Sequence, residues 1–221
     1  MLRLALDSAT EFLSVALADG ETLLAQATAR RPRGAEGFLP EGIEFVLRSA
    51  GRDRNELAGV IVTTGPGSFT GVRVGMGVAL GFAEGLGVPL HGLDTLRALA
   101  LACPRGGGTL AVALDAKRDE LYGAIFRKSP RLLEEVEPAR AQSPAAFAAR
   151  FVERRPVTAL CGTANHLYTP ADFPGADRVA MPWLAPALLG PAAAPHLRTL
   201  DAAALSVDYL RGADAKLPAA P

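Results

Sequence analysis

Cysteine and histidine are both scarce in this chain, which has two cysteines and three histidines among its 221 residues. Cys103 and Cys161 stand far apart with no CxxC motif, so we expect two buried thiols in a reducing compartment rather than a disulfide framework. His91, His166 and His196 form neither an HExxH motif nor an i, i+4 pair, the spacings with which helices hold metal ions. We therefore expect no metal ion and no cofactor.

An excess of charge is also missing, since 23 Lys and Arg residues balance 23 Asp and Glu residues. The longest basic cluster is the short stretch 30–33, whereas a protein that holds nucleic acid alone usually carries a basic face. Long apolar runs are missing too, because the most apolar stretch, 72–90, contains Arg73, Glu84 and Pro89. The first dozen residues carry an acidic residue where a secretory signal would be apolar. We expect a cytoplasmic protein with no membrane contact.

What the chain does contain is an internal repeat. LRLALDSATEFLSVAL at residues 2–17 aligns without gaps on LAVALDAKRDELYGAI at residues 110–125, which places Asp115 on Asp7. Each copy reads as an apolar strand, a terminal Asp, a polar turn and a returning strand. The alternative is chance similarity between two amphipathic hairpins, against which the shared Ala-Leu-Asp triplet argues. We predict an α/β fold of the actin/hexokinase type with two lobes, residues 1–105 and residues 106–221, the second one reduced.

The turns that follow the repeated strands are candidates for phosphate binding. A strand-end carboxylate can hold metal-bound water, while turn N–H groups and hydroxyls face phosphate oxygens. The glycine-rich loop before a helix at 71–86 offers free N–H groups and a helix dipole, although it is not a Walker A loop. The candidate residues are Asp7, Thr10, Gly65, Gly67, Ser68 and Asp115. The alternative stays open: the carboxylates are exposed strand ends, and Ser68 and Thr70 only cap a helix that the loop seats.

Two expected helices, at residues 36–50 and 71–86, are apolar on nearly every side. A small lobe can cover one face of such a helix with its own sheet, and the other face then needs a second cover. We predict that a partner protein is the second cover. The candidate contact residues are Phe38, Gly42, Phe45, Val72, Met76, Ala79, Leu80 and Ala83. The alternative is that the two helices pack on each other within the lobe, and the sequence does not say which stripe faces outward.

The segment GPGSFTGVRVG at residues 65–75 resembles the signature of the bacterial TsaB (YeaZ) family, which is related to the TsaD proteins. Further similar segments are LALDSAT at 4–10, LRSAG at 47–51, GVPLHGLDTL at 87–96, LDAKRDELY at 114–122 and YLR at 209–211. The likeness is dense over residues 2–127 and sparse afterwards. Members often carry His-Ser-Glu before the first helix, whereas this chain has Gly34, Ala35 and Glu36, so no role of that histidine is carried over.

The resemblance implies an actin-like fold of the ASKHA, ribonuclease H-like type. It also implies a non-catalytic subunit that TsaD and TsaE require to transfer threonylcarbamoyl to N6 of adenosine 37 in tRNAs reading ANN codons. In that family picture the subunit meets tRNA only through the complex, and it forms a homodimer when TsaD is absent. A second hypothesis is a nucleotide-binding, ATPase-like protein that uses Asp7, Asp115 and the loop 65–71. A third is a metallopeptidase, for which the histidine spacing offers no ligand set.

Overall fold

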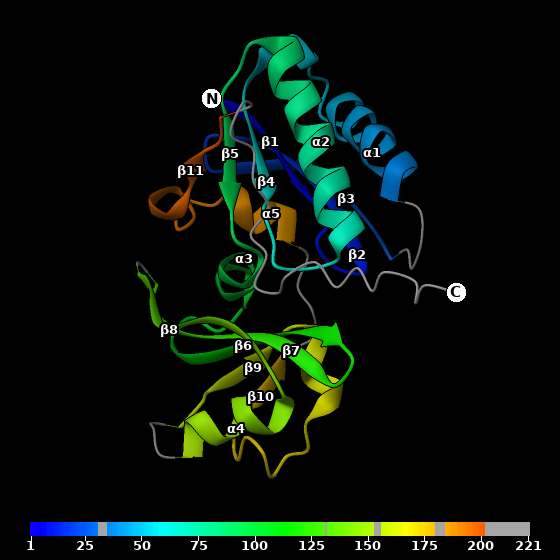
Figure 1. The fold of residues 1–221 in the computed structure, drawn as a ribbon. Helices are drawn as coiled ribbons and strands as arrows, with labels where there is room; N and C mark the ends of the chain where they lie inside the picture. Colours follow the sequence, from blue (N-terminus) through cyan, green and yellow to red (C-terminus); the bar gives the residue numbers. More distant parts are fainter. Residues whose placement is uncertain (31–34, 131, 153–155, 180–183, 202–221) are drawn as a thin grey trace, which may run out of the picture.

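The structure is a computed structural model that describes residues 1–30, 35–130, 132–152, 156–179 and 184–201. Its strands form two sheets, which Figure 1 shows one above the other. The first sheet has the order β11 (Arg198–Thr199), β5 (Leu90–Leu93), β4 (Leu57–Thr63), β1 (Leu2–Asp7), β2 (Phe12–Asp19) and β3 (Thr22–Arg30). The second sheet has the order β10 (Asp177–Val179), β9 (Ala159–Cys161), β6 (Gly108–Lys117), β7 (Glu120–Lys128) and β8 (Leu133–Gln142).

The two sheets repeat one topology. In the first sheet β1 pairs antiparallel with β2 and parallel with β4, and β2 pairs antiparallel with β3. In the second sheet β6, β7, β8 and β9 repeat these pairings in the same order. In the first sheet β5 pairs parallel with β4, and in the second sheet β10 pairs parallel with β9. The predicted duplication and the actin-like fold are therefore confirmed.

The register of the two hairpins differs by one residue. Leu6 pairs with Val15 in the first hairpin, and the gapless repeat would then pair Leu114 with Gly123. In the structure Leu114 pairs with Tyr122, because a bulge lies between Asp115 and Lys117. The turn that follows is tight, with left-handed φ angles at Lys117 and the next two residues. The second hairpin thus ends in a turn unlike that of the first.

Helices cover both faces of the first sheet. On one face, α1 (Ala35–Ser49) and α2 (Phe69–Leu86) lie side by side (Figure 1) over the large side chains of β1 and β2, such as Leu4, Leu6 and Val15. On the other face, α5 (Leu184–Leu189) packs against small side chains, among them Ala5 and Ala16. Because both faces are covered, β1 and β2 are buried along nearly their whole length instead of alternating between buried and exposed.

The core on the side of the first sheet that α5 covers continues into the second sheet through α3 (Thr95–Ala102). Leu96 and Leu99 of α3 belong to the same buried cluster as Leu110 and Phe126 of β6 and β7. Asp94 caps α3 by accepting a hydrogen bond from the backbone N–H of Arg97, at 2.8 Å. The two sheets therefore share a core.

The second lobe is reduced in its helices. α4 (Pro144–Val152) follows β8, as α1 follows β3, but η2 (Thr163–Leu167) stands where the first lobe has the 18-residue α2. The two-lobe division at 105/106 stays a prediction. The chain does pass from one sheet to the other between α3 and β6, and it returns to the first sheet with α5 and β11. No helix among the described residues combines the length and the hydropathy that crossing a membrane needs.

Candidate functional site

Asp7 lies at the carboxyl edge of the first sheet and is buried, with 1% of its surface exposed. One carboxylate oxygen, Oδ1, accepts hydrogen bonds from the Thr63 hydroxyl at 2.7 Å and from the Ala9 backbone N–H at 3.1 Å. The other oxygen, Oδ2, is buried and has no hydrogen-bond partner among the described residues. Burial raises the pKa of Asp7 to about 6, although the two hydrogen bonds act in the opposite direction. The expectation of an exposed strand-end carboxylate is corrected, because the start of α2 covers this turn.

The glycine-rich loop packs directly on the turn after Asp7. The backbone N–H of Ser68 donates to the Ala9 carbonyl at 2.7 Å, and the Ser8 hydroxyl donates to the Gly71 carbonyl at 2.7 Å. A Cβ on Gly67 would stand 2.2 Å from the Ala9 carbonyl oxygen, and one on Gly71 would stand 2.1 Å from the Ser8 carbonyl oxygen. The glycines are therefore needed for close approach between two backbone segments.

The remaining candidates in the first lobe also hold the loops together. Ser68 caps α2 by accepting a hydrogen bond from the Gly71 N–H at 3.2 Å, whereas Thr70 lies inside the helix. The Thr10 hydroxyl bonds to the backbone of its own turn at Phe12. Gly65, at a φ of 102°, accepts a hydrogen bond through its carbonyl from the N–H of Thr95. Most of the polar groups that could have met a phosphate are thus occupied within the lobe.

Asp115 meets different surroundings from those of Asp7. Its side chain accepts hydrogen bonds from the N–H and the ammonium of Lys117, both at 2.7 Å, and its backbone N–H donates to Thr163. Burial opposes ionisation, but the contacts with Lys117 outweigh it and hold the pKa of Asp115 below its usual value. His166 approaches the same carboxylate at 3.7 Å. The repeat aligns the two Asp residues in sequence, but their surroundings differ. Asp115 is partly buried and forms an ion pair with Lys117, whereas Asp7 is buried and accepts hydrogen bonds from a hydroxyl and a backbone amide.

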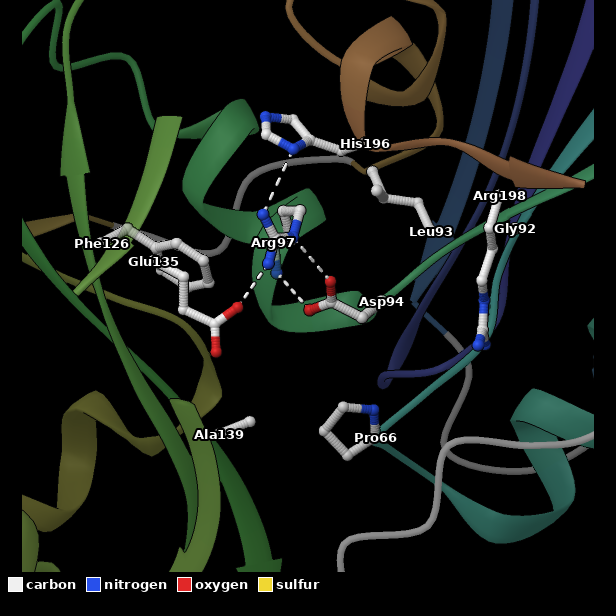
Figure 2. A pocket seen from close by; sticks show the side chains of 10 residues that line it. All are labelled: Pro66, Gly92, Leu93, Asp94, Arg97, Phe126, Glu135, Ala139, His196 and Arg198. Carbon is white, nitrogen blue, oxygen red and sulfur yellow. Dashed lines mark hydrogen bonds and ion pairs between the residues drawn. The ribbon is translucent and has the colours of Figure 1, made fainter. Parts of the chain in front are cut away.

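A cavity of about 470 Å³ lies between the two sheets and contains groups that the sequence did not single out. Figure 2 shows Arg97 at its centre, with Asp94, Glu135 and His196 around the guanidinium and Phe126 beside it. Arg97 Nε donates to Asp94 at 3.0 Å, and Arg97 also pairs with Glu135. Since α3 carries Arg97 and β8 carries Glu135, the pair ties α3 to the second sheet.

His196 completes the surroundings of Arg97. Its Nδ1 lies 3.2 Å from the guanidinium, which can only donate, so Nδ1 accepts and the ring hydrogen is on Nε2. Burial, and then the charge of Arg97, lower the pKa of His196 against the pull of Asp94. Only the pair of Asp94 and Arg97 has a local signal, the spacing i, i+3. Glu135 and His196 lie 38 and 99 residues from Arg97, so no local pattern could have found them.

The predicted partner-contact residues do not form one exposed surface. Phe45 is 47% exposed, while Phe38 and Leu80 are half-buried. The others are buried inside the lobe: Gly42, Val72, Met76, Ala79 and Ala83. The structure therefore corrects the choice of stripe on α2, because these residues face the first sheet and complete its core.

The opposite face of α2 is the one that lies outward. We call it the α2 outer face, and it consists of Val74, Gly77, Val78, Gly81, Phe82 and Gly85. Its three glycines are exposed, and a Cβ on any of them would have no atom of the described residues within 4 Å. The valines and Phe82 are half-buried. A helix that is apolar on two faces is covered by its own sheet on only one of them.

Among the described residues, no three or more His, Cys, Asp and Glu side chains gather closely enough to hold a metal ion. The expectation of no metal and no cofactor stays a prediction. The groups around Asp7 and Ser68 do not fit a phosphate either, because the N–H of Ala9, the N–H of Ser68 and the hydroxyl of Ser68 already have partners within the lobe.

A family model described as TsaD, tRNA N6-adenosine threonylcarbamoyltransferase, matches residues 36–162, more than half of the chain. The tRNA threonylcarbamoyladenosine biosynthesis protein TsaB of Escherichia coli K12 is 35% identical over 127 residues. The chain belongs to the TsaB (YeaZ) family. The match with the E. coli protein covers 57% of this chain and 54% of that protein, so the chain spans about half the length of this relative.

Two further relatives extend the likeness over more of the chain. An uncharacterized protein of Mycobacterium tuberculosis H37Rv is 30% identical over 169 residues, covering 74% of this chain and 72% of that protein. A crystal structure from Pseudomonas aeruginosa, of an uncharacterized protein with similarity to peptidase YEAZ, is 25% identical with a TM-score of 0.78. It covers 95% of this chain and 99% of that one.

The TsaB signature at residues 65–75 forms the loop and the first turns of α2. Its conspicuous glycines thus have a structural reason, the seating of α2 on the turn after β1. The position where TsaB proteins often carry histidine is Gly34, which lies outside the described residues, as do the side chains of Ala35 and Glu36.

Proposed function

We propose that this chain is the non-catalytic subunit that TsaD and TsaE require for threonylcarbamoyl transfer to N6 of adenosine 37 in tRNAs reading ANN codons, in the cytoplasm. The name of the E. coli relative supports a role in threonylcarbamoyladenosine biosynthesis. The observation that carries the proposed role as a partner is the α2 outer face. Its exposed glycines and half-buried apolar side chains would let a helix of another protein approach closely.

The partner surface that we propose includes α1 as well as α2. The two helices contact each other, and exposed Phe45 and half-buried Phe38 of α1 add aromatic area to the same side of the first sheet. Aromatic anchors carry a large share of the affinity at protein interfaces. TsaD is the proposed occupant, and a second copy of the chain takes the same surface when TsaD is absent.

The nucleotide-binding hypothesis has one specific observation in its favour. Asp7 Oδ2 is a buried carboxylate oxygen without a partner, the kind of group that could face a metal-bound water. Against it, Asp7 is 1% exposed and the neighbouring N–H groups are already bonded within the lobe. We therefore rank it second.

The purified chain alone is expected to transfer no threonylcarbamoyl group to tRNA and to hydrolyse no appreciable ATP. Transfer should appear when TsaD and TsaE are added with threonylcarbamoyl-adenylate and tRNA, and it should disappear when this chain is left out. The measurement is the modified nucleoside in digested tRNA, by mass spectrometry. Modification by this chain without TsaD would contradict the non-catalytic role.

Gly81→Glu is expected to weaken association with TsaD by about 2 kcal/mol, roughly 30-fold, because a long charged side chain would separate two closely packed backbones. A side chain at Gly81 meets nothing within 4 Å in the lobe itself, so the fold should keep its stability. The measurement is the dissociation constant by analytical ultracentrifugation, with circular dichroism as the folding check.

Ala149→Glu is the matched control, because it adds the same side chain to an exposed position of α4 in the second lobe. Its affinity for TsaD should equal that of the unchanged chain. If Gly81→Glu also bound TsaD as tightly as the unchanged chain does, TsaD would bind at a surface other than the α2 outer face.

A further inference from the structure

The two cysteines that lie far apart in the sequence meet inside the fold. Cys103 is the C-cap of α3, and Cys161 ends β9 in the second sheet, 58 residues later. Their sulfur atoms are 3.1 Å apart, about 1 Å more than a disulfide bond. Both belong to the buried cluster that α3 shares with the two sheets. The predicted burial of both thiols is confirmed. Their contact with each other was not predicted, because 58 residues separate them in the sequence.

The surroundings make the two sulfurs unequal. The Cys161 thiol donates its hydrogen to Cys103 Sγ, and this hydrogen bond, against the effect of burial, lowers the pKa of Cys103. The same hydrogen bond and burial raise the pKa of Cys161. The ammonium of Lys128 lies at the end of α3, where it donates to the Cys103 carbonyl at 2.6 Å and to the carbonyls of Ala100 and Leu101. Cys103 is therefore the sulfur favoured as a nucleophile.

A small cavity lies beside Cys103. A cavity of about 130 Å³ is lined by Cys103 and Lys128 and, around them, by exposed residues such as Pro104, Arg105 and Ser129. Cys161 does not line this cavity. Of the two cysteines, Cys103, which is 2% exposed, is therefore the one beside this cavity, where a molecule of the size of a hydroperoxide would enter.

We propose that Cys103 and Cys161 form a reversible dithiol–disulfide site that hydroperoxides oxidise. The Cys103 thiolate attacks one peroxide oxygen and the O–O bond breaks. The departing group takes a proton, so that hydroxide from hydrogen peroxide leaves as water and alkoxide from an alkyl hydroperoxide leaves as an alcohol. The Cys161 sulfur then attacks the sulfur of the Cys103 sulfenic acid, the S–O bond breaks, and the departing hydroxide leaves as water with the Cys161 thiol proton. For hydrogen peroxide, two thiols and one peroxide give one disulfide and two waters, and a thiol reductant reverses the change.

The disulfide would fasten the end of α3 to β9. α3 also carries Arg97, which pairs with Glu135 of β8, so the helix would then be joined to the second sheet at both of its ends. A cross-link across 58 residues restricts the unfolded chain strongly. Oxidation should therefore hold the two sheets in one arrangement and raise the thermal stability of the chain.

The test treats the purified, reduced, folded chain with hydrogen peroxide. The intact mass should fall by about 2 Da, the mass of two hydrogens, and a nonreducing digest should contain the peptide of Cys103 linked to that of Cys161. The thermal midpoint should rise by roughly 5 °C or more, and dithiothreitol should restore the original mass and midpoint. A native chain that gains oxygen atoms without the linked peptide, or that reacts only in denaturant, would overturn the proposal.

Two single variants distinguish the roles of the sulfurs, once circular dichroism shows that they are folded. In Cys161→Ser, peroxide and dimedone together should label Cys103, because its sulfenic acid has no second thiol to attack. In Cys103→Ser, Cys161 should stay unlabelled. Equal labelling in the two variants would contradict the assignment of Cys103 as the attacking sulfur. If a variant does not fold, the linked peptide of the unchanged chain still tests whether the two cysteines react as a pair.

Discussion

Gly71→Ala is expected to lower the free energy of unfolding by about 3 kcal/mol or more. The added Cβ would stand 2.1 Å from the Ser8 carbonyl oxygen, which belongs to the backbone and cannot rotate away as a flexible side chain could. Relief would need α2 to move from the turn after β1. That movement would break the hydrogen bond from the Ser8 hydroxyl to the Gly71 carbonyl and the one from the Ser68 N–H to the Ala9 carbonyl. The measurement is urea denaturation of the purified chain near neutral pH.

Gly77→Ala is the matched control, since it is the same substitution two turns along the same helix. A Cβ at Gly77 meets nothing within 4 Å, and alanine favours helix over glycine by about 0.5–1 kcal/mol. This variant should therefore be as stable as the unchanged chain or more stable. If the two variants had the same free energy of unfolding, the close contact between α2 and the turn after β1 would not be the reason for a glycine at position 71.

The elements that the sequence predicted correctly are those with local signals. The hairpin repeat placed β1, β2, β6 and β7, and helical spacing placed α1 and α2 within about two residues of their observed ends. Ser68 caps α2, as one of the two alternatives for that residue held, because a cap depends on residues two or three positions away. The shift of register in the second hairpin could not be foreseen, because the bulge after Asp115 depends on a turn of three left-handed residues with no glycine.

The candidate site was less predictable, because its properties depend on contacts distant in the sequence. Asp7 is buried only because α2, more than 60 residues later, seats on its turn. For the same reason the pattern on α2 revealed two apolar stripes but not which one faces the sheet. The pairing of Arg97 with Glu135 and the contact of Cys103 with Cys161 both join α3 and its C-cap to strands of the second sheet. No spacing within one segment encodes such contacts.

Asp7→Asn is expected to become more stable relative to the unchanged chain as the pH rises. Asp7 has a pKa of about 6 in the folded state and an ordinary value of 3.8, so between these values the folded chain binds more protons than the unfolded chain. Stability from this group is therefore greatest below pH 3.8, falls as the pH rises through that window, and is lowest above 6. An asparagine does not titrate, and its carbonyl can still accept from Thr63 and Ala9.

The quantity to follow is the free energy of unfolding of Asp7→Asn minus that of the unchanged chain, and this difference should increase with pH. A tenfold change in a proton-binding constant corresponds to about 1.4 kcal/mol, so the difference should grow by roughly 2–3 kcal/mol between about pH 4 and about pH 7.5. Taking the difference matters, because carboxylates such as Asp19 and Asp172 have lowered pKa values and act in the opposite direction in both proteins. The measurement is urea denaturation of both proteins at each pH.

Asp115→Asn is the control of opposite sign for the Asp7 experiment. Since the contacts with Lys117 hold the pKa of Asp115 below its usual value of 3.8, its ionised form stabilises the fold. This variant should therefore lose stability relative to the unchanged chain as the pH rises toward about 4, with little further change between about pH 5 and pH 7.5. A pH-independent difference for Asp7→Asn would mean that the carboxylate is solvated or paired with a cation, which would strengthen the nucleotide-binding hypothesis. The expected growth would instead identify Asp7 as a buried acid that helps to seat α2, since no cation then offsets its charge.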